Sequence, residues 1–199
     1  DWWTHMTDVL PVVPRQEGVS RIYSITCLVL PTGPLFLADT HVNVDPTSQQ
    51  VAEMTLLAAE VVRRFGLTPK AALLSHSSFG ASNSPTARKM REALRLIRQA
   101  APDLAADGEM HADAALKPIL RQRLVTASAL EGAANLLVMP GLDAANIALT
   151  LLSSVTDALQ VGPLLLGASK PLHILVPGVT ARGIVNMTAL AVAQGAVAR

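Results

Sequence analysis

A run of serines separates an apolar segment from a basic one in the first half of the chain. Five serines and one histidine lie between Ser75 and Ser84, directly after the apolar pair Leu73-Leu74. A Ser–His pair suggests nucleophilic catalysis, but neighbours in sequence lack the geometry of a catalytic triad. A hydroxyl-rich turn between a strand and a helix is favoured for holding phosphate, because its N–H groups face the ligand. We therefore predict a phosphate or nucleotide cradle, with ordinary turn and capping roles as the alternative.

Four arginines mark one face of the segment that follows this turn. They step by three, four and three residues, as Arg88, Arg91, Arg95 and Arg98. That spacing puts them on one side of a helix, with apolar residues on another side. The plainer interpretation is a solvated helix face. The functional interpretation is that Arg88 and Lys89, which lie nearest the helix start, contact ligand phosphates.

Two short segments group carboxylates with histidine. Asp107, Glu109, His111 and Asp113 fall within seven residues, and Asp39 lies two residues before His41. Such groups suggest a metal site. However, carboxylates between a strand and a helix are also favoured as caps and by the helix dipole. No two histidines are spaced four apart on one helix, so we predict structural roles and no metal.

The composition limits the class of protein and its partners. Half of the residues are hydrophobic, only 3% are aromatic, and the formal net charge is +1. Such a balance predicts no binding to nucleic acid or to an anionic membrane. The single cysteine, Cys27, excludes an internal disulfide, and no secretory signal is visible, which suits a cytoplasmic protein. The uncharged stretch 183–198 is shorter than the ~20 apolar residues of a membrane span.

The predicted elements alternate between strand and helix. Residues 22–30 and 35–38 predict a hairpin, and a helix follows with Asp45 as candidate N-cap, Pro46 at its first position and Gly66 as its stop. Further strands are predicted over 71–74, 104–107 and 135–139, with apolar runs at 161–167 and 172–176. Further helices are predicted over 85–100, 112–123 with a break at Pro118, 142–153 and 181–197. This order predicts an α/β fold, a three-layer αβα arrangement with a mostly parallel sheet.

Several segments, read together in this order, resemble the phosphate acetyl/butyryl transferase family over the whole chain. These segments are 37–43, 74–80, 89–93, 107–115, 134–140, 162–167 with Lys170-Pro171, and 184–187. Segments 39–43, 107–115 and 184–190 favour one subgroup, the phosphotransacetylase-like C-terminal domain of bacterial hybrid NADP-dependent malic enzymes.

The resemblance implies a two-lobed unit related to the isocitrate/isopropylmalate dehydrogenase fold, with a ligand cleft between the lobes and a dimeric assembly. We expect residues 1–44 to complete one lobe, 45–160 to form the second, and 161–199 to be a return segment ending in a helix. Because the chain begins Asp1-Trp2-Trp3 without an initiator Met, we expect the N-terminal part of the domain to be missing. No G-x-G-x-x-G motif occurs, so NADP and a divalent metal are expected only in a separate malic-enzyme half.

Four positions depart from the active family pattern. Active phosphotransacetylases carry a Ser-Arg pair, a Cys two positions on and an Asp before the final Ile-Val. Here Val176-Pro177, Val179 and Gly183 occupy these positions. The resemblance assigns the Asp to deprotonation of the CoA thiol, and the Arg and Ser to holding the acyl phosphate. The replacements can neither take a proton nor stabilise an oxyanion, so we expect no catalytic residues.

The resulting expectation is a regulatory, oligomerising domain of a malic enzyme that binds acetyl-CoA or a related CoA ester without acyl transfer. Its alternatives are an active phosphate acetyltransferase and a ligand-free dimerisation platform. The expected partners are a CoA ester and further copies of the chain. The expected ligand-binding residues are Ser75, His76, Ser77, Ser78, Gly80, Arg88, Lys89 and Lys170.

Overall fold

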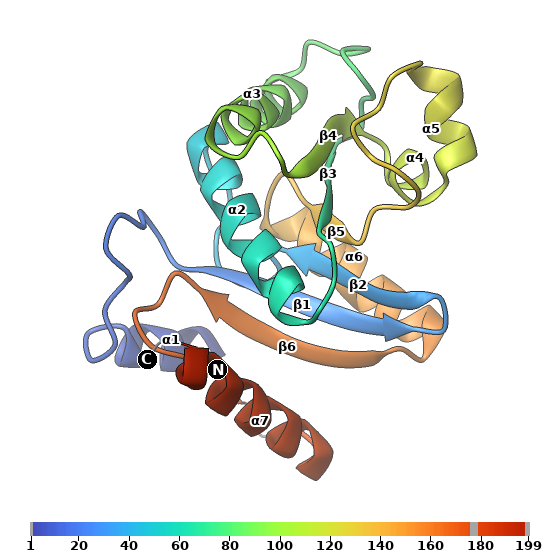
Figure 1. Ribbon diagram of the computed structural model, residues 1–199. Coiled ribbons are helices and arrows are strands. Elements are labelled where there is room, and N and C mark those ends of the chain that lie inside the picture. Colours follow the sequence, from blue (N-terminus) through green and yellow to red (C-terminus); the bar gives the residue numbers. More distant parts are fainter. Residues whose placement is uncertain (1, 176–178, 198–199) are drawn as a thin grey trace.

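The computed structural model describes residues 2–175 and 179–197. These residues form a six-stranded sheet with the strand order β4-β3-β5-β2-β1-β6 (Figure 1). Its strands are β1 (Tyr23–Leu30), β2 (Gly33–Ala38), β3 (Lys70–Leu74), β4 (Ala105–Met110), β5 (Leu136–Val138) and β6 (Leu159–Leu166). The helices are α1 (Trp2–Val9), α2 (Ser48–Arg64), α3 (Pro85–Ala100), α4 (Ala112–Leu116), α5 (Pro118–Leu124), α6 (Leu142–Thr156) and α7 (Ala181–Val197).

The pairing of the strands divides the sheet into a parallel and an antiparallel part. Strands β4, β3, β5 and β2 pair in parallel, whereas β1 pairs antiparallel with β2 on one side and β6 on the other. The predicted hairpin and the mostly parallel sheet are therefore confirmed. Because parallel strands end at the same edge, the loops after β2, β3, β4 and β5 all leave from one edge of the sheet.

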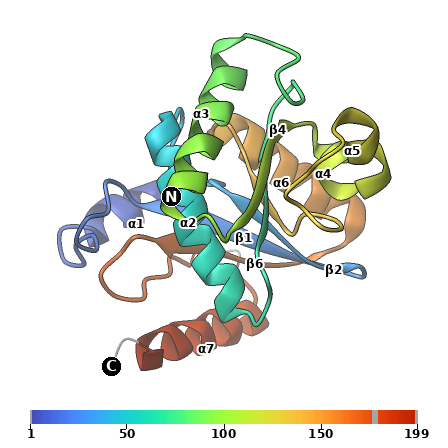
Figure 2. The same cartoon turned by 45° about the horizontal axis from the view of Figure 1, so that its top comes forward.

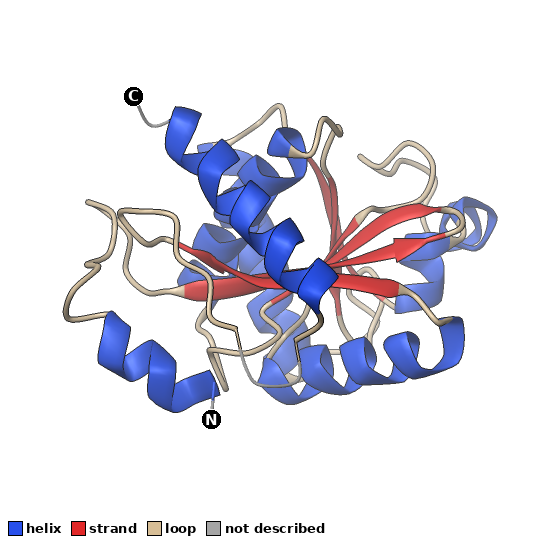
Figure 3. Ribbon diagram, turned by 90° about the horizontal axis from the view of Figure 1, so that it is seen from below, coloured by secondary structure: helices blue, strands red, loops and turns tan. Residues whose placement is uncertain are grey.

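Helices cover both faces of the sheet, as the alternation of strand and helix predicts (Figure 3). On β2, Phe36 and Ala38 face one hydrophobic cluster with α2 and α3, whereas Leu35 and Leu37 face the opposite cluster with α4 and α6. This two-residue alternation is what a strand buried on both faces requires. In Figure 2, α2 and α3 run across the sheet next to each other. The three-layer αβα arrangement is confirmed.

Local signals in the sequence locate most helix ends, with one correction. Ser84 caps α3 by accepting a hydrogen bond from the Ala87 amide at 3.2 Å, and Pro118 separates α4 from α5. Helix α2, however, starts at Ser48 with Thr47 as its N-cap, so the prediction of Asp45 as cap was wrong. Thr47 forms a capping box with Gln50, and that reciprocal pair outcompetes an Asp-Pro start two residues earlier.

The C-terminal third of the chain matches the expectations in part. Helix α7 covers 181–197 as predicted, and the run 161–167 is the end of β6. Within 172–175, structure of the strand type is limited to one isolated bridge between His173 and Leu164. The hairpin, β3–β5 and β6 all belong to one sheet. The proposed division into lobes at residues 44 and 160 stays a prediction. Over the described residues, no helix is long and apolar enough to cross a membrane.

Candidate functional site

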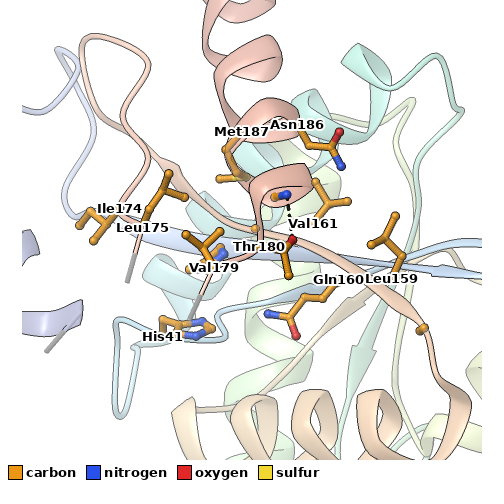
Figure 4. Close-up of a pocket in the computed structure, with 14 residues that line it drawn as sticks. His41, Leu159, Gln160, Val161, Ile174, Leu175, Val179, Thr180, Asn186 and Met187 are labelled. Carbon is orange, nitrogen blue, oxygen red and sulfur yellow. Dashed lines mark hydrogen bonds between the residues drawn. The ribbon is translucent and has the colours of Figure 1, made fainter. Parts of the chain in front are cut away.

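A pocket of about 530 Å³ lies where the start of α7 faces β6 and the loop after β2. This volume is within the range of small-molecule sites. Figure 4 shows its wall, in which apolar side chains predominate. The residues drawn there include His41, Leu159, Gln160, Val161, Ile174, Leu175, Val179, Thr180, Gly183, Asn186 and Met187.

Two of the four positions at which the resemblance leads us to expect catalytic residues lie in this pocket. Val179 and Gly183 both line it, one just before α7 and the other in its first turn. Thr180 lies between them and accepts a hydrogen bond from the Gly183 amide at 3.0 Å, as a capping hydroxyl does. Val176 and Pro177 lie outside the described residues. The wall formed by the described residues thus carries no carboxylate and no cysteine.

The Val179 side chain limits the size of the residue at position 183. A Cβ atom added at Gly183 would lie 2.8 Å from Cγ2 of Val179. That separation is far below the usual contact between carbon atoms, so any side chain at position 183 requires Val179 to shift. An aspartate at 183 would need the neighbouring residue to give way.

Asp39 organises the loop that brings His41 to the pocket. This carboxylate is 2% exposed. It accepts hydrogen bonds from the amides of His41, Val42 and Asn43 at 3.0–3.2 Å, and from the Ser24 amide and hydroxyl and the Asn43 side-chain amide. A carboxylate surrounded by donors in this way fixes the turn that leaves β2. The structural role predicted for Asp39 fits this geometry.

His41 is the titratable side chain among the described residues of the pocket wall. Its Nδ1 lies 2.9 Å from the hydroxyl of Thr40. Burial lowers the pKa of His41, and attraction from Asp39 opposes that effect. The imidazole is therefore neutral at pH 7. The sequence analysis used residues 39–43 as a weak metal candidate and as part of the family resemblance, and did not predict that His41 lines a pocket. A polar run directly after an apolar strand was a signal for this edge of the sheet.

The serine turn after β3 binds an anion that belongs to the protein itself. Glu109 is fully buried and accepts hydrogen bonds from the Ser77 hydroxyl at 2.9 Å, the Gly80 amide at 3.1 Å and Arg91 at 2.9 Å. Amides of this turn at Ser77, Ser82 and Ser84 donate to serine hydroxyls within the turn. The predicted phosphate cradle is thus already engaged by a carboxylate, and Ser75, His76 and Ser78 lie around it.

The other cations that we expected to contact a ligand are dispersed. Lys89 donates to Asp45 at 2.6 Å and to the Pro140 carbonyl at 2.8 Å, and Arg88 is exposed on α3. Lys170 lines a separate hollow of about 180 Å³ next to Arg64. None of these residues lines the pocket that contains Val179 and Gly183.

The arginine face of α3 is occupied by carboxylates. Arg91 pairs with Glu109, Arg95 pairs with Glu92 at 2.6 Å, and Arg98 pairs with Asp107 at 3.1 Å. Asp107 also accepts from the hydroxyl of Ser128 and the amide of Ala129. In the described part of the chain, no three His, Cys, Asp or Glu side chains group as a metal site. The carboxylates of 107–109 thus tie α3 to the loops around β4.

Comparison with known proteins shows the family of this chain. The model of the family "Phosphate acetyl/butaryl transferase" matches residues 3–192. A phosphotransacetylase structure from Streptococcus pyogenes superposes with a TM-score of 0.94 at 31% identity, over 99% of this chain and 60% of that one.

Two malic enzymes are similar over nearly the whole chain. An NADP-dependent malic enzyme of Salmonella typhimurium is 51% identical over 98% of this chain, and an NAD-dependent malic enzyme of Rhizobium meliloti is 50% identical over 96%. The chain spans about a quarter of the length of both, 26% and 25%. With the family model matching nearly all of its residues, this chain belongs to the phosphate acetyl/butaryl transferase family.

Proposed function

We propose that the chain is a regulatory, oligomerising domain of an NADP-dependent malic enzyme, which binds acetyl-CoA or a related CoA ester without transferring its acyl group. About 50% identity to malic enzymes over a quarter of their length supports the parentage. In such a protein, NADP, a divalent metal and the oxidative decarboxylation of malate to pyruvate belong to residues outside this chain. The same proposal locates the protein in the cytoplasm.

The proposed absence of acyl transfer rests on one observation. Val179 and Gly183 line the pocket, and they stand at the positions where the family pattern leads us to expect Cys and Asp. Neither residue can take a proton from a thiol. Removing a general base costs about 10²–10⁴-fold in rate. The close approach of Val179 also supports the proposal, because an Asp side chain at 183 would need Val179 to shift. A mostly apolar pocket of about 530 Å³ still has room for the thioester end of a CoA ester.

Regulation requires that the ligand bind one conformation of the enzyme better than another. A CoA ester held between the start of α7 and the loop after β2 touches two segments that are far apart in the sequence, so their relative position affects affinity. We therefore expect acetyl-CoA to inhibit malate decarboxylation by favouring a less active conformation.

The test uses the purified full-length protein and three measurements. We expect isothermal titration calorimetry to detect acetyl-CoA binding, and malate decarboxylation to fall as acetyl-CoA rises. We also expect no acetyl phosphate to form from acetyl-CoA and phosphate. Turnover above ~1 s⁻¹, the low end for enzymes, would show an active transferase instead. No heat with millimolar acetyl-CoA would contradict binding and leave only the dimerisation platform.

A further inference from the structure

We propose that a hollow between α2 and the loop after β6 binds a phosphate group through Arg64 and Lys170. The hollow has a volume of about 180 Å³ and is separate from the pocket that contains Val179 and Gly183. The proposal goes beyond the proposed function, because it does not depend on whether that pocket holds a CoA ester. The phosphate group is either free in solution or part of a larger molecule such as CoA.

Two cations reach the hollow from segments that are distant in the sequence. Arg64 belongs to the last turn of α2, and Lys170 belongs to the loop after β6. Across residues 2–175 and 179–197, neither side chain forms an ion pair or a side-chain hydrogen bond. The arginines of α3 differ in this respect, since Arg91, Arg95 and Arg98 each pair with a carboxylate. The charges of Arg64 and Lys170 are thus available to a ligand.

One carboxylate lines the hollow, and its charge is already compensated. Glu60 forms an ion pair with Arg63, three residues later on α2. A Glu and an Arg four residues apart on a helix can also pair, but the Glu60 carboxylate contacts Arg63 and not Arg64. With this carboxylate compensated, Arg64 and Lys170 leave a net charge of +2 around the hollow.

Backbone contacts hold the loop that carries Lys170. The amide of Ser169 donates to the carbonyl of Pro14 at 2.8 Å. Gly167 has a φ of +83°, and a Cβ atom there would lie 2.9 Å from the carbonyl oxygen of Arg21, so a side chain at 167 would push the two segments apart. The backbone of Lys170 is therefore fixed next to α2 before a ligand arrives, which reduces the entropy lost on binding.

A phosphate group matches the charge and the size of the hollow. A phosphate monoester carries about −1.5 to −2 at pH 7, because its second pKa is ~6. That charge compensates both cations, whereas a carboxylate compensates one. Arg64 presents a planar fork of donors that fits phosphate oxygens, and the Lys170 ammonium acts as a point charge. Because drug-sized sites have ~300–1,000 Å³, a smaller hollow suits one small group, with the rest of a larger ligand outside it.

Strand β6 connects the hollow with the larger pocket. Residues 159–163 line the pocket, and Leu165 and Leu166 line the hollow. The strand from Gln160 to Leu166 spans about 20 Å at ~3.3 Å per residue. CoA carries its thiol and its 3′-phosphate at opposite ends of a long flexible molecule. The 3′-phosphate of a CoA ester is therefore one source of the phosphate group, and inorganic phosphate is the other.

The first experiment titrates inorganic phosphate into the purified full-length protein by isothermal titration calorimetry, at pH 7.5 and constant ionic strength. We expect Arg64→Gln and Lys170→Gln each to weaken phosphate binding ~10-fold, about the value of one charge-assisted hydrogen bond partly exposed to water. Arg88→Gln, at an exposed position of α3, removes the same charge outside the hollow and should leave the affinity unchanged.

A third substitution in the hollow should increase the affinity. Glu60→Gln removes a negative charge from the wall and releases Arg63 from its ion pair. We expect phosphate to bind ~2–5-fold more tightly to this variant, the range of an exposed ionic interaction. A purely structural disturbance of the hollow would weaken binding instead, so a loss of affinity in Glu60→Gln would contradict the electrostatic basis of the site.

Dephospho-CoA, which lacks only the 3′-phosphate of CoA, distinguishes the two sources. If the CoA phosphate occupies the hollow, CoA should bind the wild-type protein ~10-fold more tightly than dephospho-CoA, and Lys170→Gln should remove the difference. If the hollow takes free phosphate, both compounds should bind equally while inorganic phosphate binding still depends on Lys170.

The outcomes also separate this proposal from the proposed function. If Arg64→Gln and Lys170→Gln change neither phosphate binding nor the ratio between CoA and dephospho-CoA, the phosphate site is overturned and the proposed function stands. If neither CoA compound binds the wild-type protein, the proposed function is contradicted, and the titration with inorganic phosphate decides about the hollow.

Discussion

At the scale of single residues, Val179 and Gly183 act as a pair. The Cβ of any larger residue at 183 would meet the Val179 methyl group at 2.8 Å. A smaller side chain at 179 would leave more room for a residue larger than glycine at 183. The side chains at positions 179 and 183 therefore restrict each other.

We expect a double-mutant cycle to reveal this coupling. Gly183→Ala in a Val179→Ala background should stabilise the protein by up to ~1 kcal/mol, the difference in helix propensity. With Val179 in place, Gly183→Ala should leave the free energy of unfolding unchanged or lower it. Urea denaturation of the four proteins measures the cycle, and additive effects within ~0.3 kcal/mol would show that the residues do not touch.

Two histidines link stability to pH. Burial lowers the pKa of His173 and also that of His41, where Asp39 opposes the shift. The unfolded chain, with a histidine pKa of about 6.5, therefore binds more protons than the folded one. The free energy of unfolding therefore has its full value above about pH 6.5, where these histidines are neutral in both states. It decreases as the pH falls from there through the lower pKa of the folded-state histidines.

We therefore expect the free energy of unfolding to be lower at pH 5.5 than at pH 7.5. His41→Gln and His173→Gln should each reduce this difference, because a glutamine does not titrate in this range. Urea denaturation at the two pH values provides the measurement. Gln49→Ala, an exposed substitution that changes no titratable group, is the control and should leave the difference unchanged.

At the scale of elements, the serine turn and α3 are held by Glu109. The carboxylate joins Ser77 and Gly80 of the turn to Arg91 of α3. This arrangement explains why a turn with the composition of a phosphate cradle occurs here: the anion that its N–H groups and hydroxyls surround is a side chain from β4.

Arg91→Ala should destabilise the protein by about 2–3 kcal/mol, since it leaves a buried carboxylate without its cation. Arg95→Ala is the matched control on the same helix. Its pair with Glu92 is 53% and 42% exposed, so water and salt screen it and its loss should cost much less than that of Arg91. Equal effects of the two substitutions in chemical denaturation would contradict the structural role of Glu109.

At the scale of the whole molecule, α6 offers an apolar surface for self-association. Ile147, Leu151 and Val155 recur every four residues on α6 and are 60–69% exposed. A stripe of this kind on one helix face is typical of an interface. It supports the proposed homo-oligomer, together with exposed Val185 and Val192 on α7.

We expect the purified protein to sediment as an oligomer, and Leu151→Glu to shift it toward the monomer by placing a charge in the interface. Thr150→Glu, on a neighbouring side of α6, controls for added charge. Analytical ultracentrifugation measures the masses. A wild-type monomer at micromolar concentration would contradict the proposal, and an oligomer insensitive to Leu151→Glu would exclude α6 as its interface.

The sequence by itself determined the layers of the fold and the family. Continuous apolar runs on β2 and β3 and helical spacing on α2 and α3 are local patterns, so they predicted the αβα arrangement closely. The sequence did not predict helix α1. It also misplaced the start of α2, because Asp45-Pro46 and Thr47 are both good helix starts and the Gln50 contact decides between them. Segment order and motifs identified the phosphate acetyl/butaryl transferase family.

Only the tertiary structure decided which residues share a site. Turn composition cannot show that Glu109, 32 residues beyond Ser77, occupies the space expected for a phosphate. Likewise, His41 meets Val179 and Gly183 because β2 and β6 both flank β1, although more than a hundred residues of chain separate them. Local preferences determine elements from neighbouring residues, whereas a pocket depends on long-range packing that brings distant segments together.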